Sequence, residues 1–416
     1  MDSMNAVTEV SYALDTFYFL LSGVLVMWMA VGFTMLEAGM VRTKNTVEIL
    51  AKNVGLFAIA SVMYLIVGYN IMYDGSASSI IPGLSFLVGG DNSVEAAVAG
   101  DAYYSDMSDF FFQLVFAGAA MSIVSGAVAE RMKLFAFLAF AVVMTAVIYP
   151  VQGYWSWGGG FLDELGYLDY AGSGIVHMAG AAAALAGVIL VGSRKGKYGP
   201  KGEINALPGS SMPLVTLGTF ILWMGWFGFN GGSELKVSDV ESANNVAQVF
   251  TNTNMAAAGG VIAALITSKL LFGKVDLTMV LNGALAGLVA ITAEPLMPSA
   301  FLAIIIGAIG GVIVVFAILG LDRLRLDDPV GAISVHGVVG IWGVLAVLLS
   351  NPDATFMGQI VGIISIFAWV FLASLAIFAI IKAVIGLRVD EEHEYEGMDQ
   401  SECGMEAYPE FTQSGK

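Results

Sequence analysis

The sequence is poor in residues that titrate or form crosslinks. Its single cysteine, Cys403, excludes a disulfide framework and a cysteine-based metal cluster within the chain. Charged residues make up only 12% of the 416 residues, against about 25% in a typical soluble domain. The 17 lysines and arginines are outnumbered by 34 acids, and they form no basic face that could neutralise phosphates. We therefore expect no nucleic-acid partner.

The motifs of catalysis are also missing. The chain shows no nucleophile–base set, glycine-rich phosphate loop or cofactor motif, so we predict neither an enzyme nor a bound cofactor. The first residues, MDSMNAVTEVS, contain no lysine or arginine and therefore lack the basic region of a cleavable signal peptide. We interpret the first apolar stretch as a retained membrane helix.

Apolar residues, by contrast, are abundant and occur in long runs. They make up 57% of the chain, and 50 glycines lie among them, as is typical of membrane helices. A helix that crosses a bilayer needs about 20 mostly apolar residues. The sequence therefore predicts an all-α integral membrane protein with eleven transmembrane helices. The predicted spans are residues 13–36, 47–72, 108–129, 133–155, 172–193, 211–231, 247–272, 276–294, 299–320, 331–350 and 355–387.

Basic residues mark one side of this predicted membrane protein. Lysines and arginines flank the odd-numbered connections between spans, whereas the even-numbered connections contain only Lys236. Short cytoplasmic loops are enriched in basic residues. We therefore expect a multi-pass protein of the cell membrane, with its N-terminus outside and its C-terminus in the cytoplasm.

Two similar motifs open the fifth and tenth spans. Asp169 lies eight residues before His177 in DYAGSGIVH, and Asp328 lies eight residues before His336 in DDPVGAISVH. The motifs predict two inverted five-helix repeats and a long eleventh helix, an arrangement that commonly places a binding site at the repeat interface. Chance is the alternative for so short a match. The predicted repeats are residues 13–193 and 211–350, and the eleventh helix is residues 355–387.

His177 and His336 are the only imidazoles in the predicted membrane region, because His393 belongs to the acidic tail. Ionisable groups inside a membrane are costly and are candidates for function. Since a neutral imidazole offers one donor and one acceptor nitrogen, two facing histidines can share a proton and line a pore. A buried pair that merely ties helices together is the alternative. A zinc site is not expected, because two imidazoles leave the metal shell incomplete.

Aromatic residues form a second group of candidates. Ring faces attract a small cation, more strongly when the cation is partly dehydrated. Aromatic residues are also ordinary in membrane helices, so the pattern alone does not decide between a cation site and packing. Ser233 follows the last aromatic segment and can accept a hydrogen bond from an N–H donor. The candidates are Phe112 and Phe116 in FFFQLVFAG, Trp157 in YWSWGGG, and Trp226 and Phe229 in WMGWFGFNGGS.

Five segments occur in a distinctive order along nearly the whole chain. They are FQLVFAG, WGGG with DYAGSGIVH, ILWMGWFGFNGGS, DDPVGAISVHG and EGMDQSECGMEAYPEF. Together they resemble the ammonium transporter (Amt/Mep/Rh) family, on its Amt branch. The resemblance implies a homotrimer in the lipid bilayer, in which each eleven-helix protomer has its own pore for ammonium or ammonia.

The resemblance also implies roles for the aromatic candidates near the outer end of the pore. Trp157, Phe112 and Ser233 match a site that recruits ammonium. Phe116 and Phe229 match a stacked phenylalanine gate below that site.

Further candidates match the inner part of the family's pore. His177 and His336 match the twin histidines of a hydrophobic pore, and Trp226 matches an aromatic residue of its wall. Asp169 matches an aspartate that supports the outer site. Some relatives carry an aspartate five residues before the second histidine, where this chain has Gly331, so no role is carried over there.

The C-terminal tail, residues 389–416, follows a predicted membrane domain of residues 1–388. Nine acids lie between Asp390 and Glu410. The tail resembles the segment through which many family members meet PII-type signal proteins, but it has Cys403 where relatives often have histidine. A sequence that only improves solubility is the alternative.

The function implied by the resemblance is transmembrane transport of ammonium. A narrow apolar pore opposes an intact charge, because desolvating an ion costs several kcal/mol. We therefore expect deprotonation near the phenylalanine gate and separate movement of ammonia and the proton along the histidines, which makes net transport electrogenic. The alternatives are an electroneutral ammonia channel and an ammonium sensor that signals through the tail.

The alternation of basic loops gives a test of topology. In intact cells, a tag placed after Lys416 should be protected from an external protease and a tag before Met1 should be accessible. Finding both tags on the same side would contradict the eleven-span arrangement and the inverted repeats.

Overall fold

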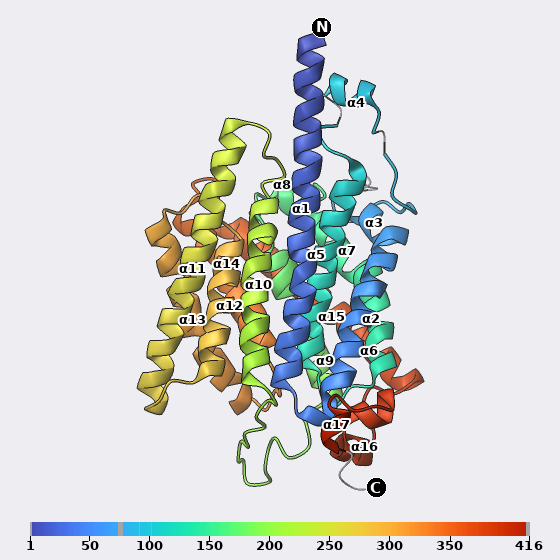
Figure 1. The fold of residues 1–416 in the computed structure, drawn as a ribbon, viewed down its shortest axis with the longest axis vertical. Helices are drawn as coiled ribbons and strands as arrows, with labels where there is room; N and C mark the ends of the chain where they lie inside the picture. The colour runs from blue at the N-terminus through green and yellow to red at the C-terminus, as the bar shows by residue number, and fades with distance from the viewer. Residues whose placement is uncertain (1, 74–77, 91, 101, 413–416) are drawn as a thin grey trace.

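The fold is a bundle of long helices (Figure 1). The computed structural model describes residues 2–73, 78–90, 92–100 and 102–412, and within these ranges the chain forms helices and no β-sheet. The α1 helix begins at one end of the bundle and the C-terminal tail lies at the other. The predicted all-α class is confirmed.

The helices have the following bounds. The α-helices are α1 (Asp2–Met40), α2 (Thr46–Met63), α3 (Tyr69–Tyr73), α4 (Val94–Ala99), α5 (Asp106–Ala127), α6 (Leu134–Val143), α7 (Tyr149–Ser156), α8 (Phe161–Glu164), α9 (Ala179–Val191), α10 (Met212–Gly232), α11 (Val240–Phe272), α12 (Leu277–Thr292), α13 (Ala300–Arg323), α14 (Val339–Ala346), α15 (Phe356–Val384), α16 (Glu391–Glu396) and α17 (Pro409–Thr412). The 3₁₀ turns are η1 (Thr43–Asn45) and η6 (Val347–Leu349). The π-helical turns are η2 (Tyr64–Gly68), η3 (Met144–Ile148), η4 (Ser173–Met178), η5 (Ile333–Val338) and η7 (Asp399–Cys403).

Nine helical segments of the described chain are long and apolar enough to cross a membrane. Each overlaps one of the predicted spans. Two shorter apolar segments, Leu277–Thr292 and Ile333–Leu349, lie where the eighth and tenth spans are predicted. The helices thus agree with a multi-pass membrane protein, whereas the count of eleven crossings and the inverted repeats stay predictions.

Two long helices begin earlier than the apolar pattern predicts. The α1 helix begins at Asp2 rather than at residue 13, and it projects beyond its neighbours in Figure 1. The α11 helix begins at Val240 rather than at residue 247, because the Asp239 side chain caps it by accepting the N–H of Ser242 at 2.8 Å. Hydropathy marks only the part of a helix that lipid or protein covers, so it misses polar first turns.

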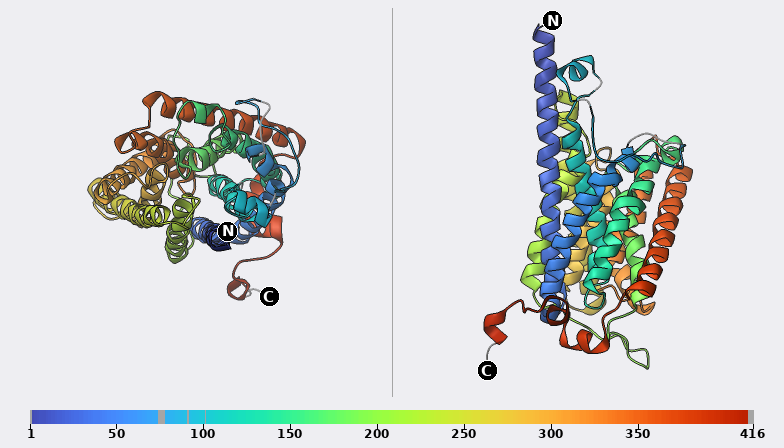
Figure 2. Two further views of the ribbon diagram at one scale, coloured as in Figure 1. Left: turned by 90° about the horizontal axis from the view of Figure 1, so that it is seen from above. Right: turned by 90° about the vertical axis from the view of Figure 1, so that its right-hand side faces the viewer.

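The α1 and α10 helices lie side by side and join the two halves of the chain. Their backbones approach so closely that two glycines have no room for a side chain. A Cβ atom on Gly218 would lie 2.4 Å from the backbone nitrogen of Leu36, and one on Gly39 would lie 2.5 Å from the carbonyl oxygen of Ser211. Small residues allow this kind of close contact between membrane helices. On the opposite side of the bundle, α15 packs along α9 (Figure 2).

Four charged side chains tie loops together at the end of the bundle that carries the tail, which we call the tail end. Glu130 pairs with Arg42 at 2.9 Å and with Arg194 at 3.0 Å, and Arg194 also pairs with Asp327 at 2.9 Å. Burial alone would raise the pKa of Glu130, but Arg194 and Arg42 outweigh it and lower this pKa to about 2. The carboxylate therefore stays charged at neutral pH, as a buried ion pair requires.

The acidic tail is docked on this end of the bundle through its carboxylates. Asp399 Oδ1 accepts the N–H of Glu48 at 2.9 Å, and Glu402 Oε2 accepts the N–H of Leu134 at 2.9 Å. Both N–H groups belong to the first turn of a helix, α2 and α6, where they lack helical partners and carry partial positive charge. These contacts give the tail a defined position beyond any effect on solubility. His393 is exposed on α16 within this tail.

Candidate functional site

The two membrane histidines lie on similar turns in the two halves of the chain. His177 belongs to η4 and His336 to η5, and each of these π-helical turns opens an apolar α-helix. Short π-turns in helices often occur at functional sites. The local structure thus repeats where the sequence motif repeats.

Asp169 shapes the turn that carries His177. Its Oδ1 accepts the N–H of Gly172 at 3.1 Å, and its Oδ2 accepts those of Gly174 and Ile175 at 2.9 and 2.8 Å. Gly172 has a φ of 108°, which a residue with a side chain rarely adopts. Burial raises the pKa of Asp169 to about 6 despite these hydrogen bonds. Asp169 therefore acts on the site through the backbone.

Asp328 has the same relation to the turn that carries His336. Its Oδ1 accepts the N–H of Gly331 at 3.1 Å, and its Oδ2 accepts that of Ile333 at 2.7 Å. Gly331 also has a positive φ, of 84°. The spacing of eight residues between aspartate and histidine therefore reflects a shared local fold, in which the aspartate caps the turn.

The imidazole rings of His177 and His336 meet in the middle of the bundle. Their Nδ1 atoms are 3.2 Å apart, and the rings are tilted by only 23°. Both side chains are buried, at 0% and 3% exposure. A hydrogen bond between two Nδ1 atoms requires that only one of them carries the proton. Nε2 of His177 has no hydrogen-bond partner in the described chain, so it remains open to a substrate or proton.

A line of stacked rings leads away from the histidine pair. Phe229 stacks on His177 with ring centroids 5.3 Å apart, and Phe116 stacks on Phe229 at 4.1 Å. Phe112 meets Phe116 edge-on at 4.8 Å. All three phenylalanines are almost fully buried. The two predicted gate residues therefore lie against each other and separate the histidines from Phe112.

Trp226 forms a side wall for the same region. Its ring stacks on His177 with centroids 4.9 Å apart. Its Nε1 donates a hydrogen bond to Thr292 Oγ1 at 2.8 Å, so the ring presents its apolar face to the histidine. Its role as a residue of a pore wall, which the resemblance implies, stays a prediction.

A cavity of about 430 Å³, which we call the outer cavity after the predicted orientation, lies beyond the stacked rings. Its lining includes all three predicted recruitment residues, Phe112, Trp157 and Ser233, together with Phe116. Trp157 Nε1 donates to the carbonyl oxygen of Asp169 at 2.9 Å, which fixes the orientation of the indole ring. Ser233 Oγ donates to the carbonyl oxygen of Phe229 at 2.9 Å, which leaves its lone pairs as acceptors.

Sequence reasoning missed several polar residues of this cavity. Asp109 lies in the lining, with Tyr69 and Gln113 donating hydrogen bonds to its carboxylate. Tyr170 also lines the cavity, and its hydroxyl donates to Glu234. Asp109 carried a signal, because it is a carboxylate inside a predicted span and one helical turn before Phe112. The partners of Asp109 could not be found from spacing alone.

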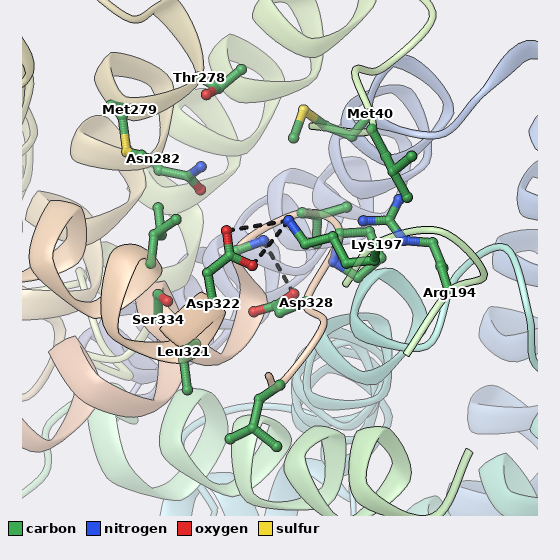
Figure 3. A pocket seen from close by; sticks show the side chains of 16 residues that line it. Met40, Arg194, Lys197, Thr278, Met279, Asn282, Leu321, Asp322, Asp328 and Ser334 are labelled. Atoms are coloured by element: carbon green, nitrogen blue, oxygen red, sulfur yellow. Dashed lines mark hydrogen bonds and ion pairs between the residues drawn. The ribbon is translucent and has the colours of Figure 1, made fainter. Parts of the chain in front are cut away.

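Two cavities lie on the other side of the histidine pair, toward the tail end. The first, of about 20 Å³, is lined by His336 and also by Asn282, Val330 and Gly331. The second, of about 140 Å³, shares these last three residues and extends to the ion pair of Lys197 and Asp322 (Figure 3). The outer cavity, the rings, the histidines and these inner cavities therefore follow one another through the bundle.

Comparison with known proteins identifies the family. The model described as the Ammonium Transporter Family matches residues 17–408. The chain belongs to this family. Ammonium transporter Amt2 of Archaeoglobus fulgidus is 40% identical, over 96% of this chain and 89% of that protein. The ammonium transporter of Bacillus subtilis is 33% identical, over 95% of this chain and 98% of its own. These relatives are named as transporters rather than enzymes.

Solved structures agree with this membership of the ammonium transporter family. The structure titled "Sensor Amt Protein" matches with a TM-score of 0.88 and 35% identity, over 95% of this chain and 99% of its own. The crystal structure of Candida albicans Mep2 matches with a TM-score of 0.81 and 26% identity, over 93% of this chain and 88% of its own. The resemblance found in the sequence is thus confirmed.

The outer cavity of this family member gives a test with a matched control. Replacing Trp157 by leucine removes a ring face that contributes about 0.5–2 kcal/mol to a bound cation, so apparent ammonium affinity should fall about 2- to 30-fold. Trp155→Leu is the control, because the Trp155 indole donates a hydrogen bond to the carbonyl oxygen of Ile80 and does not line the cavity. The measurement is the concentration dependence of ammonium-driven current. Equal curves for Trp157→Leu and wild type would make Trp157 a packing residue.

Proposed function

We propose that the protein transports ammonium across the membrane electrogenically, by recruiting the cation at the outer cavity and passing ammonia and a proton separately along the histidine pair. The observation that carries the proposal is the succession of cavity, stacked rings, paired histidines and inner cavities. Membership of the ammonium transporter family supplies the substrate.

The outer cavity has the chemistry of a site for a small cation. Trp157 and Phe112 offer ring faces, and Ser233 offers a hydroxyl oxygen that can accept an N–H hydrogen bond. The carboxyl group of Asp109 adds oxygen acceptors to the same lining. Ammonium can donate hydrogen bonds to these oxygens, which potassium cannot do.

The stacked rings favour deprotonation before passage. Phe116 and Phe229 are fully buried and offer no oxygen to replace the hydration shell of an ion. Losing that shell costs several kcal/mol, whereas a single ring face returns about 2 kcal/mol to a desolvated cation. Neutral ammonia avoids this cost, and its proton needs a separate carrier.

The histidine pair has the properties of such a carrier. A proton that arrives at Nε2 of His177 can release the proton on its Nδ1 to Nδ1 of His336, which is 3.2 Å away. His336 can then release a proton from its own Nε2 toward the inner cavities. Each transfer makes one N–H bond and breaks one, and together they leave both imidazoles in the opposite tautomer, so the pair must return to its starting tautomers before the next proton enters.

The same proposal includes the arrangement in the membrane. We propose eleven crossings in two inverted five-helix repeats plus α15, with the tail in the cytoplasm. We also propose a homotrimer. Its support includes large apolar side chains that α1 exposes along its length, such as Phe17, Val24 and Trp28, which need lipid or another protomer as cover. The mass of the protein in detergent tests the trimer.

Two alternative functions differ from this proposal in one measurement. An electroneutral ammonia channel and a sensor that transports little would both give no sustained current after an ammonium pulse on protein-containing liposomes. One similar solved structure is titled a sensor, but the relatives named above are called transporters, so sensing is the less favoured alternative.

The histidine relay predicts the outcome of alanine substitutions. In His177→Ala and His336→Ala, ammonium-driven current should collapse while neutral ammonia still passes, because the relay is broken but the dry path remains. Current and ammonia flux are measured on the same trimeric preparations in liposomes. Wild-type current in both variants would contradict the relay.

The control for these variants is Ser173→Ala. Ser173 Oγ donates a buried hydrogen bond to the carbonyl oxygen of Val289 at 2.7 Å in the same turn as His177. Its loss costs about 1–3 kcal/mol of stability, as an unpaired buried group does, but leaves both imidazoles in place. Current that falls equally in Ser173→Ala would indicate a structural effect only.

The tail is also proposed to bind a PII-type signal protein. A chain ending at Arg388 should lose this binding, because it lacks the docked segment with the exposed rings of Tyr408 and Phe411. Tyr408→Ala should weaken binding while the tail stays docked, whereas Phe356→Ala, an exposed ring at the far end of α15, should not. Co-purification with the PII-type protein of the same organism measures this. Undiminished binding to the truncated chain would contradict the role of the tail.

A further inference from the structure

We propose that Glu37 accepts the proton from the histidine pair on its tail-end side, and that the proton and ammonia part at this point. This inference rests on the proposed relay, which requires an acceptor after His336. No role for Glu37 follows from the motifs that carry the family resemblance.

The position of Glu37 is fixed by the α1 helix. Phe33 lies beside His336, with ring centroids 6.1 Å apart. Glu37 is four residues further along α1 and therefore on the same face, one turn closer to the tail end. Glu37 and His336 both line the inner cavity of about 20 Å³, together with Ser122 and Asn282.

One oxygen of the Glu37 carboxylate accepts hydrogen bonds, and the other has none. Glu37 Oε2 accepts hydrogen bonds from Ser125 Oγ at 2.6 Å and from Asn53 Nδ2 at 3.1 Å. Oε1 has no hydrogen-bond partner among the described residues, although the side chain is only 1% exposed. An unpaired buried polar atom is costly, and an ionisable group inside a membrane is a candidate for function.

The small cavity can bridge the two groups. A space of about 20 Å³ holds one water molecule, for which about 10–15 Å³ is sufficient. Nδ1 of His336 is engaged with His177, so Nε2 is the nitrogen that can release a proton. The N–H bond on Nε2 breaks and an O–H bond forms on Glu37 Oε1, directly or through that water. No electron is transferred and no other reactant is needed.

Charged side chains of α2 lie on the tail-end side of Glu37. Lys52 is close enough to interact electrostatically with Glu37, and its Nζ lies 3.6 Å from Glu48. The side chains of Lys52 and Glu48 are almost fully buried. Asp399 of the tail accepts the backbone N–H of Glu48 at 2.9 Å, so the docked tail covers the end of this group of charged residues.

Ammonia has a different exit. The cavity of about 140 Å³ shares Asn282, Val330 and Gly331 with the small cavity but is not lined by Glu37. This cavity is lined by the ion pair of Lys197 and Asp322 and by Asp328, but not by Lys52 or Glu48. The two products of deprotonation thus have separate routes from the histidine pair.

Glu37→Gln is the test, because it keeps the shape of the side chain but cannot accept the proton. In liposomes, ammonium-driven current should fall about a hundredfold, the lower range for losing a positioned acid–base group. Ammonia permeation, followed with a pH-sensitive dye inside the liposomes, should stay at the wild-type level. Glu37→Asp should recover part of the current, because it restores a carboxylate.

The matched control is Glu294→Gln. Glu294 is another buried glutamate in a hydrogen-bond network, where Asn351 donates to it at 2.6 Å, and it lines none of the three cavities of the path. The ratio of current to ammonia permeation should be unchanged in this variant. A ratio that falls equally in both variants would overturn the inference.

The outcomes separate this inference from the proposed function. If the wild-type protein gives current and Glu37→Gln gives an equal current, only the role of Glu37 is overturned. A wild-type protein without current overturns the electrogenic function and this inference together. If Glu37→Gln does not assemble, Glu37→Asp decides: a lower ratio of current to ammonia permeation supports the inference, and a wild-type ratio overturns it.

Discussion

The hydrogen bond between His177 and His336 joins two turns that are 159 residues apart in the sequence. It forms only if both rings enter the bundle at the same depth and with nearly parallel planes. The caps provided by Asp169 and Asp328 meet this condition, because each fixes the backbone from which a histidine projects. The geometry of the site thus depends on two carboxylates that do not touch either imidazole.

The dryness of the region around this hydrogen bond determines what can pass. An intact ammonium ion would exchange its hydration shell for the rings of Phe116 and Phe229. The attraction of the rings is weaker than the lost hydration by several kcal/mol. A neutral imidazole pair tolerates the same surroundings, because its only strong polar contact is internal. The apolar interior that excludes the ion therefore also favours the histidine hydrogen bond.

Much of the helical layout could be predicted from hydropathy, because lipid-covered and core-covered helices are both apolar. Polar first turns such as that of α11 were not predicted, since side-chain caps rather than apolar residues define them. The histidines could be found because ionisable groups are rare in the spans. The contact of Phe116 with Phe229 followed only from the family resemblance, as the two residues lie on different helices.

The buried and docked carboxylates were the part of the structure that was hardest to predict from the sequence. Asp109 lies in the first turn of a predicted span, where a carboxylate is a signal, whereas Glu37 lies just beyond the end of another span and looks like an ordinary boundary residue. Their burial depends on partners far away in the sequence, such as Ser125, which is 88 residues from Glu37. The docked tail is a similar case, because Asp399 meets Glu48 across 351 residues. Composition shows how many acids a segment has, but tertiary structure decides which N–H groups they bind.

Separate routes for proton and ammonia also explain selectivity under the proposed mechanism. Potassium resembles ammonium in charge and size, so ring faces in the outer cavity attract both ions. Potassium, however, has no proton to release, and the stacked rings of Phe116 and Phe229 offer it no oxygen ligands. Discrimination then arises from the step that splits the substrate rather than from the site that binds it. Beyond the histidines, Glu37 lies on the proton's side, whereas Asp322 on the side of ammonia is paired with Lys197, so its charge is already balanced and does not attract an intact cation.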